Sequence, residues 1–277
     1  MFEKSDNERT MLTSTQIEKA ALDLYEAEKT KRQIDLLSNR HPGLTLDESY
    51  AIQDALVDLK LKDGRKQIGW KIGLTSRAMQ MALKIETPDS GVIFDDMYYP
   101  NGSRIPRGTF FEPRIEAEIA FIMGRDLAPS DLNRDGIVEA TEHIAPALEI
   151  LETRVVRYNP ETRTYRNVCD TIADNAANAG IVLADNRYHL EDIDPRWMGG
   201  IIKRNGIVEE TGLGAGILDD PITSVLWLAR RLAEYDKFIG RGDIIMAGSF
   251  IRPIEAPSGS DFFADFGPFG TVECYFE

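Results

Sequence analysis

Hydrophobic side chains in the first part of the chain recur at the spacing of an amphipathic helix. They lie three or four residues apart, so one helix face carries Ile17, Ala20, Ala21, Leu24 and Ala27. Thr15 and Glu18 have the spacing of a capping box, in which each side chain satisfies a free backbone amide at the helix start. We therefore expect a first helix that begins at Thr15.

A second helix is expected from Thr45, which has the same capping spacing to Glu48. Gly64 is a suitable stop for this helix, and its apolar face carries Ile52, Ala55, Leu56 and Leu59. The turn at 41–43 separates the two helices. We expect both helices to serve packing or contact with another subunit.

From Gln67 onward the pattern changes to short β-type runs separated by Gly, Pro, Asn and Asp. The runs cover residues 68–74, 91–99, 114–123, 180–184, 201–210, 243–248, 260–266 and 270–277. Asn205-Gly206 predicts a two-residue hairpin because both residues tolerate positive φ. Pro221 opens the helix expected among these strands, whose apolar face carries Val225, Leu226, Ala229 and Leu232. The pattern predicts an α+β protein with a helical region over 1–66 and a β-rich domain over 67–277.

Composition narrows the function classes. The 277 residues include 46 acidic and 32 basic side chains, a net charge of -14, which argues against a nucleic-acid partner. No apolar run approaches the roughly 20 residues that span a bilayer, and the first ten residues lack an apolar signal core. We therefore expect a cytoplasmic protein without a membrane partner. The chain has only two cysteines and three histidines. Any catalytic or metal-binding chemistry must therefore depend mainly on carboxylates, lysine, arginine and hydroxyls.

The run Arg114–Phe121 contains two acids at alternate positions. In a strand, Glu116 and Glu118 face the same way, with Cα atoms roughly 6–7 Å apart. Two such carboxylates repel one another unless a positive group lies between them, and a hard divalent cation accepts oxygen ligands of this kind. A solvated strand face is the alternative, and this motif alone favours it.

Glu149 is a lone acid in the apolar run 146–151. A buried carboxylate is costly unless it is paired or bound to a metal. Glu149 is therefore a candidate third metal ligand, and a salt bridge with Arg154 is the alternative.

Lys71 lies in an apolar run between Gly69 and Gly73, which allow a ligand or a backbone to approach closely. A desolvated lysine can transfer a proton or pair with an anionic substrate. An exposed strand face is again the alternative. Ser249 follows Gly248 after the expected strand at 243–246, a position typical of a binding loop.

Five segments in this order resemble the 2-oxo-acid hydratase branch of the fumarylacetoacetate hydrolase superfamily, from about residue 30 to the C-terminus: GWKIGLTS, PDSGVIFDDM, PRIEAEIAF, PALEILETR and DTIADNAANAG. The resemblance implies a mixed β-sandwich or barrel core with a helical N-terminal region. It also implies Mg²⁺ or Mn²⁺ held by Glu116, Glu118 and Glu149, with Lys71 as the pocket lysine.

Within this branch, the segments YNPET at 158–162 and GSFIRP at 248–253 resemble those of enzymes for a 2-oxo dicarboxylic acid. The resemblance then implies hydration of a carbon–carbon double bond during the breakdown of aromatic compounds. Lys71 and Asp96 are the acid–base candidates, and we expect Leu74, Thr75 and Ser249 to contact the substrate. The distal carboxylate needs a cation, for which the sequence offers Arg154, Arg157, Arg163 and Arg166.

Other functions fit the same residues. A hydratase for the five-carbon monoacid, a decarboxylase and a carbon–carbon hydrolase are all compatible with this metal site, although the shortage of histidine disfavours the hydrolase. A non-catalytic partner subunit is the alternative outside enzymology. The resemblance further implies a homo-oligomer, and a complex with a related decarboxylase is compatible with it.

Overall fold

The computed structural model describes residues 11–77, 80–81, 85 and 87–277, and these form two compact units. The first unit takes the chain up to Asp63 together with Arg154–Asn175. The second takes Gly64–Thr153 and Ala176–Glu277. The first break between the units therefore lies close to the expected boundary at residue 66, while the return of 154–175 to the helical unit had no signal in the sequence. The division into a helical region over 1–66 and a β-rich domain over 67–277 stays a prediction.

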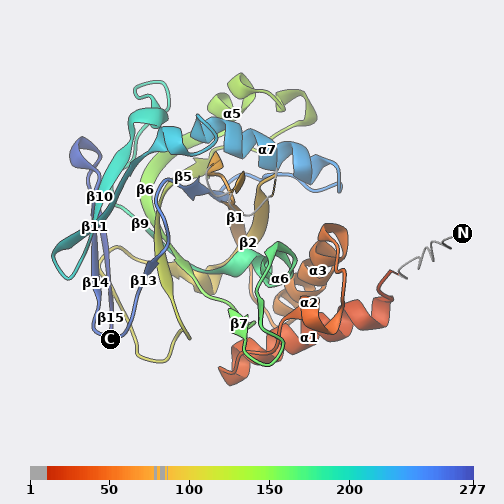
Figure 1. Ribbon diagram of the computed structural model, residues 1–277. Helices are drawn as coiled ribbons and strands as arrows, with labels where there is room; N and C mark the ends of the chain where they lie inside the picture. The colour runs from red at the N-terminus through yellow and green to blue at the C-terminus, as the bar shows by residue number, and fades with distance from the viewer. Residues whose placement is uncertain (1–10, 78–79, 82–84, 86) are drawn as a thin grey trace, which may run out of the picture. The chain divides into compact units, whose positions relative to one another are not determined.

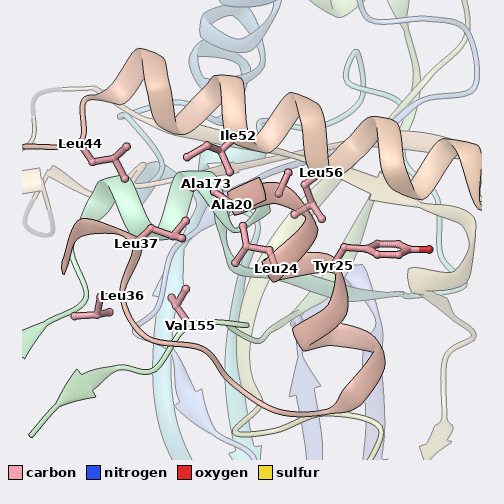
Figure 2. Packing of buried hydrophobic residues seen from close by; sticks show 11 residues of the cluster. Ala20, Leu24, Tyr25, Leu36, Leu37, Leu44, Ile52, Leu56, Val155 and Ala173 are labelled. Carbon is pink, nitrogen blue, oxygen red and sulfur yellow. The ribbon is translucent and has the colours of Figure 1, made fainter. Parts of the chain in front are cut away.

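The first unit is mainly helical. Its elements are α1 (Ser14–Thr30), α2 (Leu37–Arg40), α3 (Leu46–Lys62), the short strands β7 (Tyr158–Asn159) and β8 (Thr164–Tyr165), and α6 (Val168–Ala173). α1 packs against α3, and α6 packs against both α2 and α3. Figure 2 shows Leu24 of α1 and Ile52 and Leu56 of α3 pointing into the same space, where they form one apolar core with Val155 and Ala173.

The cap expected for the second helix is confirmed, and the cap expected for the first is wrong by two residues. Thr45 caps α3 in a reciprocal pair with Glu48. α1 instead begins with Thr13 as its cap, and the Thr13 hydroxyl accepts from the amide of Gln16. Glutamine serves this role as well as glutamate does, so the sequence offered two overlapping capping pairs.

Arg154 forms a buried ion pair inside the first unit. Its amide and its Nε donate to the two carboxylate oxygens of Asp174 at 2.6 and 2.5 Å. Burial raises the pKa of Asp174, although the Arg154 charge and its hydrogen bonds act in the opposite direction. Both residues belong to the returning segment, so the pair holds its two ends together.

The second unit is built on two sheets. The larger has the strand order β2-β1-β12-β5-β6-β9-β3, with β13 adding to β5. Its strands are β1 (Gln67–Gly73), β2 (Asp89–Phe94), β3 (Tyr98–Tyr99), β5 (Arg114–Met123), β6 (Thr141–Leu151), β9 (Asn178–Leu183), β12 (Ile244–Ser249) and β13 (Ile254–Glu255). The sheet is mixed, because β1 runs parallel to β12 while most other neighbours are antiparallel. Figure 1 shows it strongly curled.

The smaller sheet has the order β11-β10-β14-β15-β4. Its strands are β4 (Ser103–Ile105), β10 (Gly199–Arg204), β11 (Ile207–Leu213), β14 (Asp261–Asp265) and β15 (Thr271–Phe276). The β10–β11 hairpin turns at Asn205 and Gly206, whose φ angles are 53° and 77°, so the hairpin prediction is confirmed. The α+β prediction is confirmed as well.

Among the described residues of the second unit, the helices α5 (Arg134–Ala140) and α7 (Pro221–Ala233) pack against each other (Figure 1). Asp220 caps α7. The apolar face of α7 packs on β12 and β1. Short 3₁₀ turns are η1 (Asp95–Met97), η2 (Pro129–Asp131), η3 (Asn175–Ala177), η4 (Pro195–Trp197), η5 (Gly214–Gly216) and η6 (Gly267–Phe269). Within the described residues, every helix is too short or too polar to cross a bilayer.

Candidate functional site

The structure brings Glu116, Glu118 and Glu149 together on the larger sheet. β5 and β6 pair antiparallel in a register that places Glu116 directly opposite Glu149. Glu118 follows two residues along β5 and therefore faces the same way. One carboxylate oxygen from each of the three residues lies within 4.8 Å of the other two. The alternate spacing in the sequence thus produces one cluster of acids.

This cluster is not a solvated strand face. Glu118 and Glu149 are fully buried, and Glu116 is half-buried. The amide of Gly248 donates to Glu118 Oε2 at 2.9 Å. Glu118 Oε1 and both oxygens of Glu149 are buried without a hydrogen-bond partner. Such atoms are costly unless a ligand satisfies them, and Arg154 does not, because it pairs with Asp174.

Lys71 extends from β1 into the same cluster. Its side chain is buried, and Nζ lies 3.5 Å from Glu149 Oε1. Burial alone would lower the pKa of the ammonium, but the carboxylates of Glu149 and Asp89 and their neighbours outweigh burial and raise it above its usual value. Lys71 therefore carries a positive charge at neutral pH.

A strained turn presents a second partner to Lys71. Nζ donates to the carbonyl oxygen of Ala176 at 3.0 Å. Ala176 and its neighbour Ala177 have φ angles of 51° and 60°, in the left-handed region. Non-glycine residues in that region cost of order 1–3 kcal/mol each and cluster at functional sites. The hydrogen bond to this turn helps to hold the Lys71 side chain in place.

Asp89 is a fourth buried acid, and sequence reasoning missed it. It begins β2 and pairs with Gly73 at the end of β1. A Cβ at Gly73 would lie 2.2 Å from Asp89 Oδ1 and 3.1 Å from Lys71 Nζ, so a larger residue there would displace the Asp89 carboxylate. Asp89 Oδ1 is buried without a hydrogen-bond partner. Burial raises the pKa of this carboxyl, and the Lys71 charge counteracts part of that effect.

Thr75, one of the expected substrate contacts, lies beside the cluster. It is buried, and a Cβ at Gly248 would come within 2.2 Å of its hydroxyl oxygen. Gly248, with φ 113°, is the residue whose amide binds Glu118. Leu74 has a left-handed φ of 56°, and its carbonyl accepts from the side chain of Gln80 at 2.7 Å. Leu74 and Thr75 as substrate contacts stay a prediction.

Ser249 and Asp96 have other partners in the structure. The Ser249 hydroxyl donates to the carbonyl of Ile251 at 2.9 Å, within its own loop. Asp96 lies in the exposed turn η1, where its carboxylate pairs with Arg65 Nε at 3.1 Å. The structure therefore does not place Asp96 among the buried acids, and the aspartate beside Lys71 is Asp89. Asp96 as an acid–base group and Ser249 as a substrate contact stay predictions.

The balance of charge suits a divalent cation. Four carboxylates, those of Glu116, Glu118, Glu149 and Asp89, surround the single ammonium of Lys71. Burial, and next the Glu149 charge, raise the pKa of Glu116 to about 8 and that of Glu118 well above its ordinary range. Donors that are all oxygen match the preference of Mg²⁺ and Mn²⁺. The residues present therefore fit the metal that the sequence reading implied.

Because these buried acids have raised pKa values, we expect the free energy of unfolding of the metal-free protein to depend on pH. Because the pKa of Glu116 rises from 4.5 to about 8, the folded state binds its proton more tightly than the unfolded state between these values. The free energy of unfolding should therefore fall as pH rises from 5 to 8. A bound cation replaces the proton, so saturating Mg²⁺ should remove this slope. Urea denaturation between pH 5 and 8 measures the free energy of unfolding, once in EDTA and once in saturating Mg²⁺. The prediction is contradicted if this free energy changes with pH equally in the two conditions.

Known proteins that are similar to this chain include hydratases of 2-oxo acids and a decarboxylase with bound magnesium. No family model matches the chain. The chain is 43% identical over 253 residues to 2-oxo-hept-4-ene-1,7-dioate hydratase of Escherichia coli, covering 91% of this chain and 95% of that protein. It is 33% identical to 2-keto-4-pentenoate hydratase of Paraburkholderia xenovorans, with 96% and 97% covered. Among solved structures, 4-oxalocrotonate decarboxylase from Pseudomonas putida G7, complexed with magnesium and adipate, superposes with a TM-score of 0.90 at 28% identity, covering 96% and 99%.

Proposed function

The chain belongs to the 2-oxo-acid hydratase branch of the fumarylacetoacetate hydrolase superfamily, and from this premise we propose that it hydrates the double bond of 2-oxohept-4-ene-1,7-dioate. The product is 4-hydroxy-2-oxoheptane-1,7-dioate. The observation that carries the proposal is the buried group of Glu116, Glu118 and Glu149 beside Lys71. The similarity to the hydratase of Escherichia coli over 91% of the chain supports the seven-carbon diacid as substrate.

Glu116, Glu118 and Glu149 would hold Mg²⁺ or Mn²⁺, since one carboxylate oxygen of each lies within 4.8 Å of the other two, and Glu118 and Glu149 have buried oxygens without a hydrogen-bond partner. When bound, a divalent cation acts as a Lewis acid and stabilises the negative charge that develops on the 2-oxo group. The magnesium complex of the related decarboxylase supports this choice of metal.

We assign the proton movements of the reaction to Asp89 and Lys71. The double bond first moves into conjugation with the 2-oxo group, as C3 loses a proton and C5 gains one. The oxygen of water then adds at C4, and C3 receives a proton. Asp89 Oδ1 is buried without a partner, and the raised pKa of this carboxyl suits a group that takes a proton from water and returns it to C3. Lys71 Nζ keeps its charge, so it can hold the C1 carboxylate or donate a proton. Its bond to the Ala176 carbonyl orients it for either role.

A decarboxylase is the second candidate, because a 4-oxalocrotonate decarboxylase shares the fold with a TM-score of 0.90. Loss of CO₂ also develops negative charge at the same end of the substrate. The metal site and Lys71 therefore do not separate the two reactions. The higher identity to a hydratase, 43% against 28%, favours hydration.

A substrate comparison tests the proposal. The purified protein with Mg²⁺ is offered the seven-carbon diacid and the five-carbon monoacid, and loss of dienol absorbance and release of CO₂ are followed. We expect faster turnover of the diacid at low concentration, with no CO₂. Stoichiometric CO₂ would show a decarboxylase, and preference for the monoacid would move the assignment to a pentenoate hydratase.

The substrate class has more support than the oligomeric state or the cellular location of the protein. The substrate is a small dicarboxylic 2-oxo acid. A homo-oligomer, a complex with a related decarboxylase and a cytoplasmic location stay predictions, and size-exclusion chromatography with light scattering would measure the first.

A further inference from the structure

Arg114 opens strand β5 on the same face of the sheet as two acids of the metal cluster. Side chains alternate along a strand, so Arg114, Glu116 and Glu118 point the same way. The pairing of β5 with β6 is regular from Arg114 to Ile122, so no bulge interrupts this alternation. Two residues of a strand span about 6–7 Å, which separates the Cα atoms of Arg114 and Glu116. Both strands lie within the second unit.

The face that carries these residues becomes more exposed toward Arg114. Glu118 is fully buried, Glu116 is half-buried, and 27% of the Arg114 side chain is exposed. The paired strand β6 shows the same trend, since Glu149 is fully buried while Leu151, opposite Arg114, is half-buried. A ligand whose reacting end lies at the acids can therefore extend toward Arg114.

The guanidinium of Arg114 has donors that the protein itself does not use. Its Nε is buried without a hydrogen-bond partner. Its Nη2 lies 3.4 Å from Glu255 Oε1 on β13. That distance exceeds the roughly 2.7–2.9 Å of a charge-assisted hydrogen bond. Because a guanidinium offers five N–H donors and keeps its charge in a protein, Arg114 can bind an anion and still keep this contact.

Arg114 is not a counter-ion of the metal cluster. Among the residues that the structure describes, no ion pair joins its guanidinium to Glu116, Glu118 or Glu149, and the cation paired with Glu149 is Lys71. Arg114 therefore places a positive charge next to the cluster without neutralising it.

The substrate of the proposed reaction has a second negative group that needs such a charge. Its 2-oxo end would lie at the metal, and the four carboxylates there would repel the C7 carboxylate. Three bonds of an extended chain span about 3.5 Å, so C1 and C7, which six bonds separate, lie about 7 Å apart. This length is comparable to the spacing between Glu116 and Arg114 along β5.

We propose that Arg114 binds the distal carboxylate of the substrate and makes the site selective for a 2-oxo dicarboxylic acid. This inference rests on the proposed function. A planar guanidinium binds a carboxylate through two parallel hydrogen bonds, which the ammonium of a lysine does not form. The four arginines within 154–166 belong to the first unit, whereas Arg114 and the three acids belong to the second. The selectivity thus arises on the strand that supplies two of the metal ligands.

Arg114→Gln tests the proposal, with Arg104→Gln as the matched control. Arg104 lies on β4 of the same unit, is 65% exposed and pairs with Glu277 at 3.1 Å, so its substitution also removes one charge and one ion pair. Arg114→Lys keeps the charge without the planar fork and serves if the glutamine variant does not fold.

Two readouts are measured on the full-length protein. The first is kcat/KM with Mg²⁺ for the seven-carbon diacid and for the five-carbon monoacid. The second is calorimetric binding of 2-oxoheptanedioate, a saturated analogue that cannot be hydrated, to the Mn²⁺-loaded protein. 2-Oxoheptanoate, which lacks only the distal carboxylate, is the comparison ligand.

Arg114→Gln should weaken binding of 2-oxoheptanedioate and lower kcat/KM for the diacid by roughly 10- to 100-fold, because hydrogen bonds to a charged group are lost. Binding of 2-oxoheptanoate and turnover of the monoacid should stay within about twofold of the wild type. Arg104→Gln should match the wild type in every measurement, and Arg114→Lys should fall between the wild type and Arg114→Gln.

The proposal is refuted if a folded Arg114 variant binds 2-oxoheptanedioate as tightly as the wild type, or loses affinity for both analogues equally. It is also refuted if the wild type does not prefer 2-oxoheptanedioate to 2-oxoheptanoate, since no cation would then recognise the distal carboxylate. A wild-type protein that prefers 2-oxoheptanedioate but hydrates neither substrate would refute the proposed function alone, because the difference in affinity still reports on Arg114.

Discussion

Glu118→Gln should abolish Mn²⁺ binding and lower kcat/KM by at least about 10³-fold, a change of about 4 kcal/mol in transition-state stabilisation. Glu118 is fully buried on β5, and its Oε1 has no hydrogen-bond partner. The substitution keeps an oxygen for the Gly248 amide but removes one of the three negative charges of the cluster. A neutral amide is a poor ligand for a hard divalent cation that needs buried carboxylates.

The same variant should be more stable than the wild type when both are free of metal. Burial raises the pKa of Glu118 well above its ordinary range, which means that the ionised form is unfavourable in the folded state. The glutamine amide also gives Glu149 a hydrogen-bond donor where it has an unpartnered oxygen. Thermal unfolding in EDTA, calorimetric Mn²⁺ titration and steady-state kinetics together measure these effects.

Glu112→Gln is the control for Glu118→Gln, because Glu112 is exposed just before β5 and loses the same charge. It should bind Mn²⁺ and turn over substrate like the wild type. A folded Glu118→Gln variant with wild-type affinity for Mn²⁺ would show that the three carboxylates are not the metal site.

Lys71→Met should lower kcat by about 10² to 10⁴-fold, the usual range for loss of an acid–base group, while Mn²⁺ binding persists. Methionine fills a similar volume but removes the ammonium that lies 3.5 Å from Glu149 and donates to Ala176. Removing a positive charge beside the three acids cannot weaken their attraction for a cation. The combination of retained metal and lost turnover therefore distinguishes this variant from Glu118→Gln.

Lys66→Met serves as the matched control, since Lys66 is exposed at the entry to β1 and only its backbone contacts Asp95. Kinetics and calorimetry should be measured on Mn²⁺-loaded proteins, because Lys71→Met leaves buried acids without a counter-charge when metal is absent. Wild-type kcat in the Lys71→Met variant would remove Lys71 from the mechanism.

The sequence could predict the parts of the site that depend on local periodicity. Glu116 and Glu118 share a face because strand side chains alternate, and this follows from two positions in a row of apolar residues. Glu149 was a candidate because a lone acid in an apolar run is costly. The structure adds the register that sets Glu149 opposite Glu116, which depends on pairing across more than 30 residues.

Local sequence patterns could not identify Asp89 as a residue of the site. In the sequence it follows a proline and precedes serine and glycine, which reads as a turn. Its burial depends on pairing with Gly73 across the β1–β2 connection, and on the space that a glycine leaves there. Asp96, seven residues later, has the same chemistry in the sequence but is exposed beside Arg65. No spacing rule separates the two aspartates.

The helical unit shows a similar limit. Its helices follow from capping and apolar spacing, and the expected core of Leu24, Ile52 and Leu56 forms as the pattern indicated. The segment 154–175 joins them through backbone bonds of Ile34 with Arg154 and Val156. Its two ends are held together by the buried pair of Arg154 and Asp174, residues 20 positions apart. The sequence offered Glu149 as the partner of Arg154, because five residues separate them and nothing local points to Asp174.

The most direct test of the account is the metal dependence of hydration. The protein is treated with EDTA, dialysed and mixed with the seven-carbon diacid, and dienol absorbance and product are followed before and after Mg²⁺ is added. We predict no reaction before addition, and afterwards 4-hydroxy-2-oxoheptane-1,7-dioate without CO₂. Hydration at the full rate before Mg²⁺ is added, in protein shown to be free of metal, would contradict the role given to Glu116, Glu118 and Glu149.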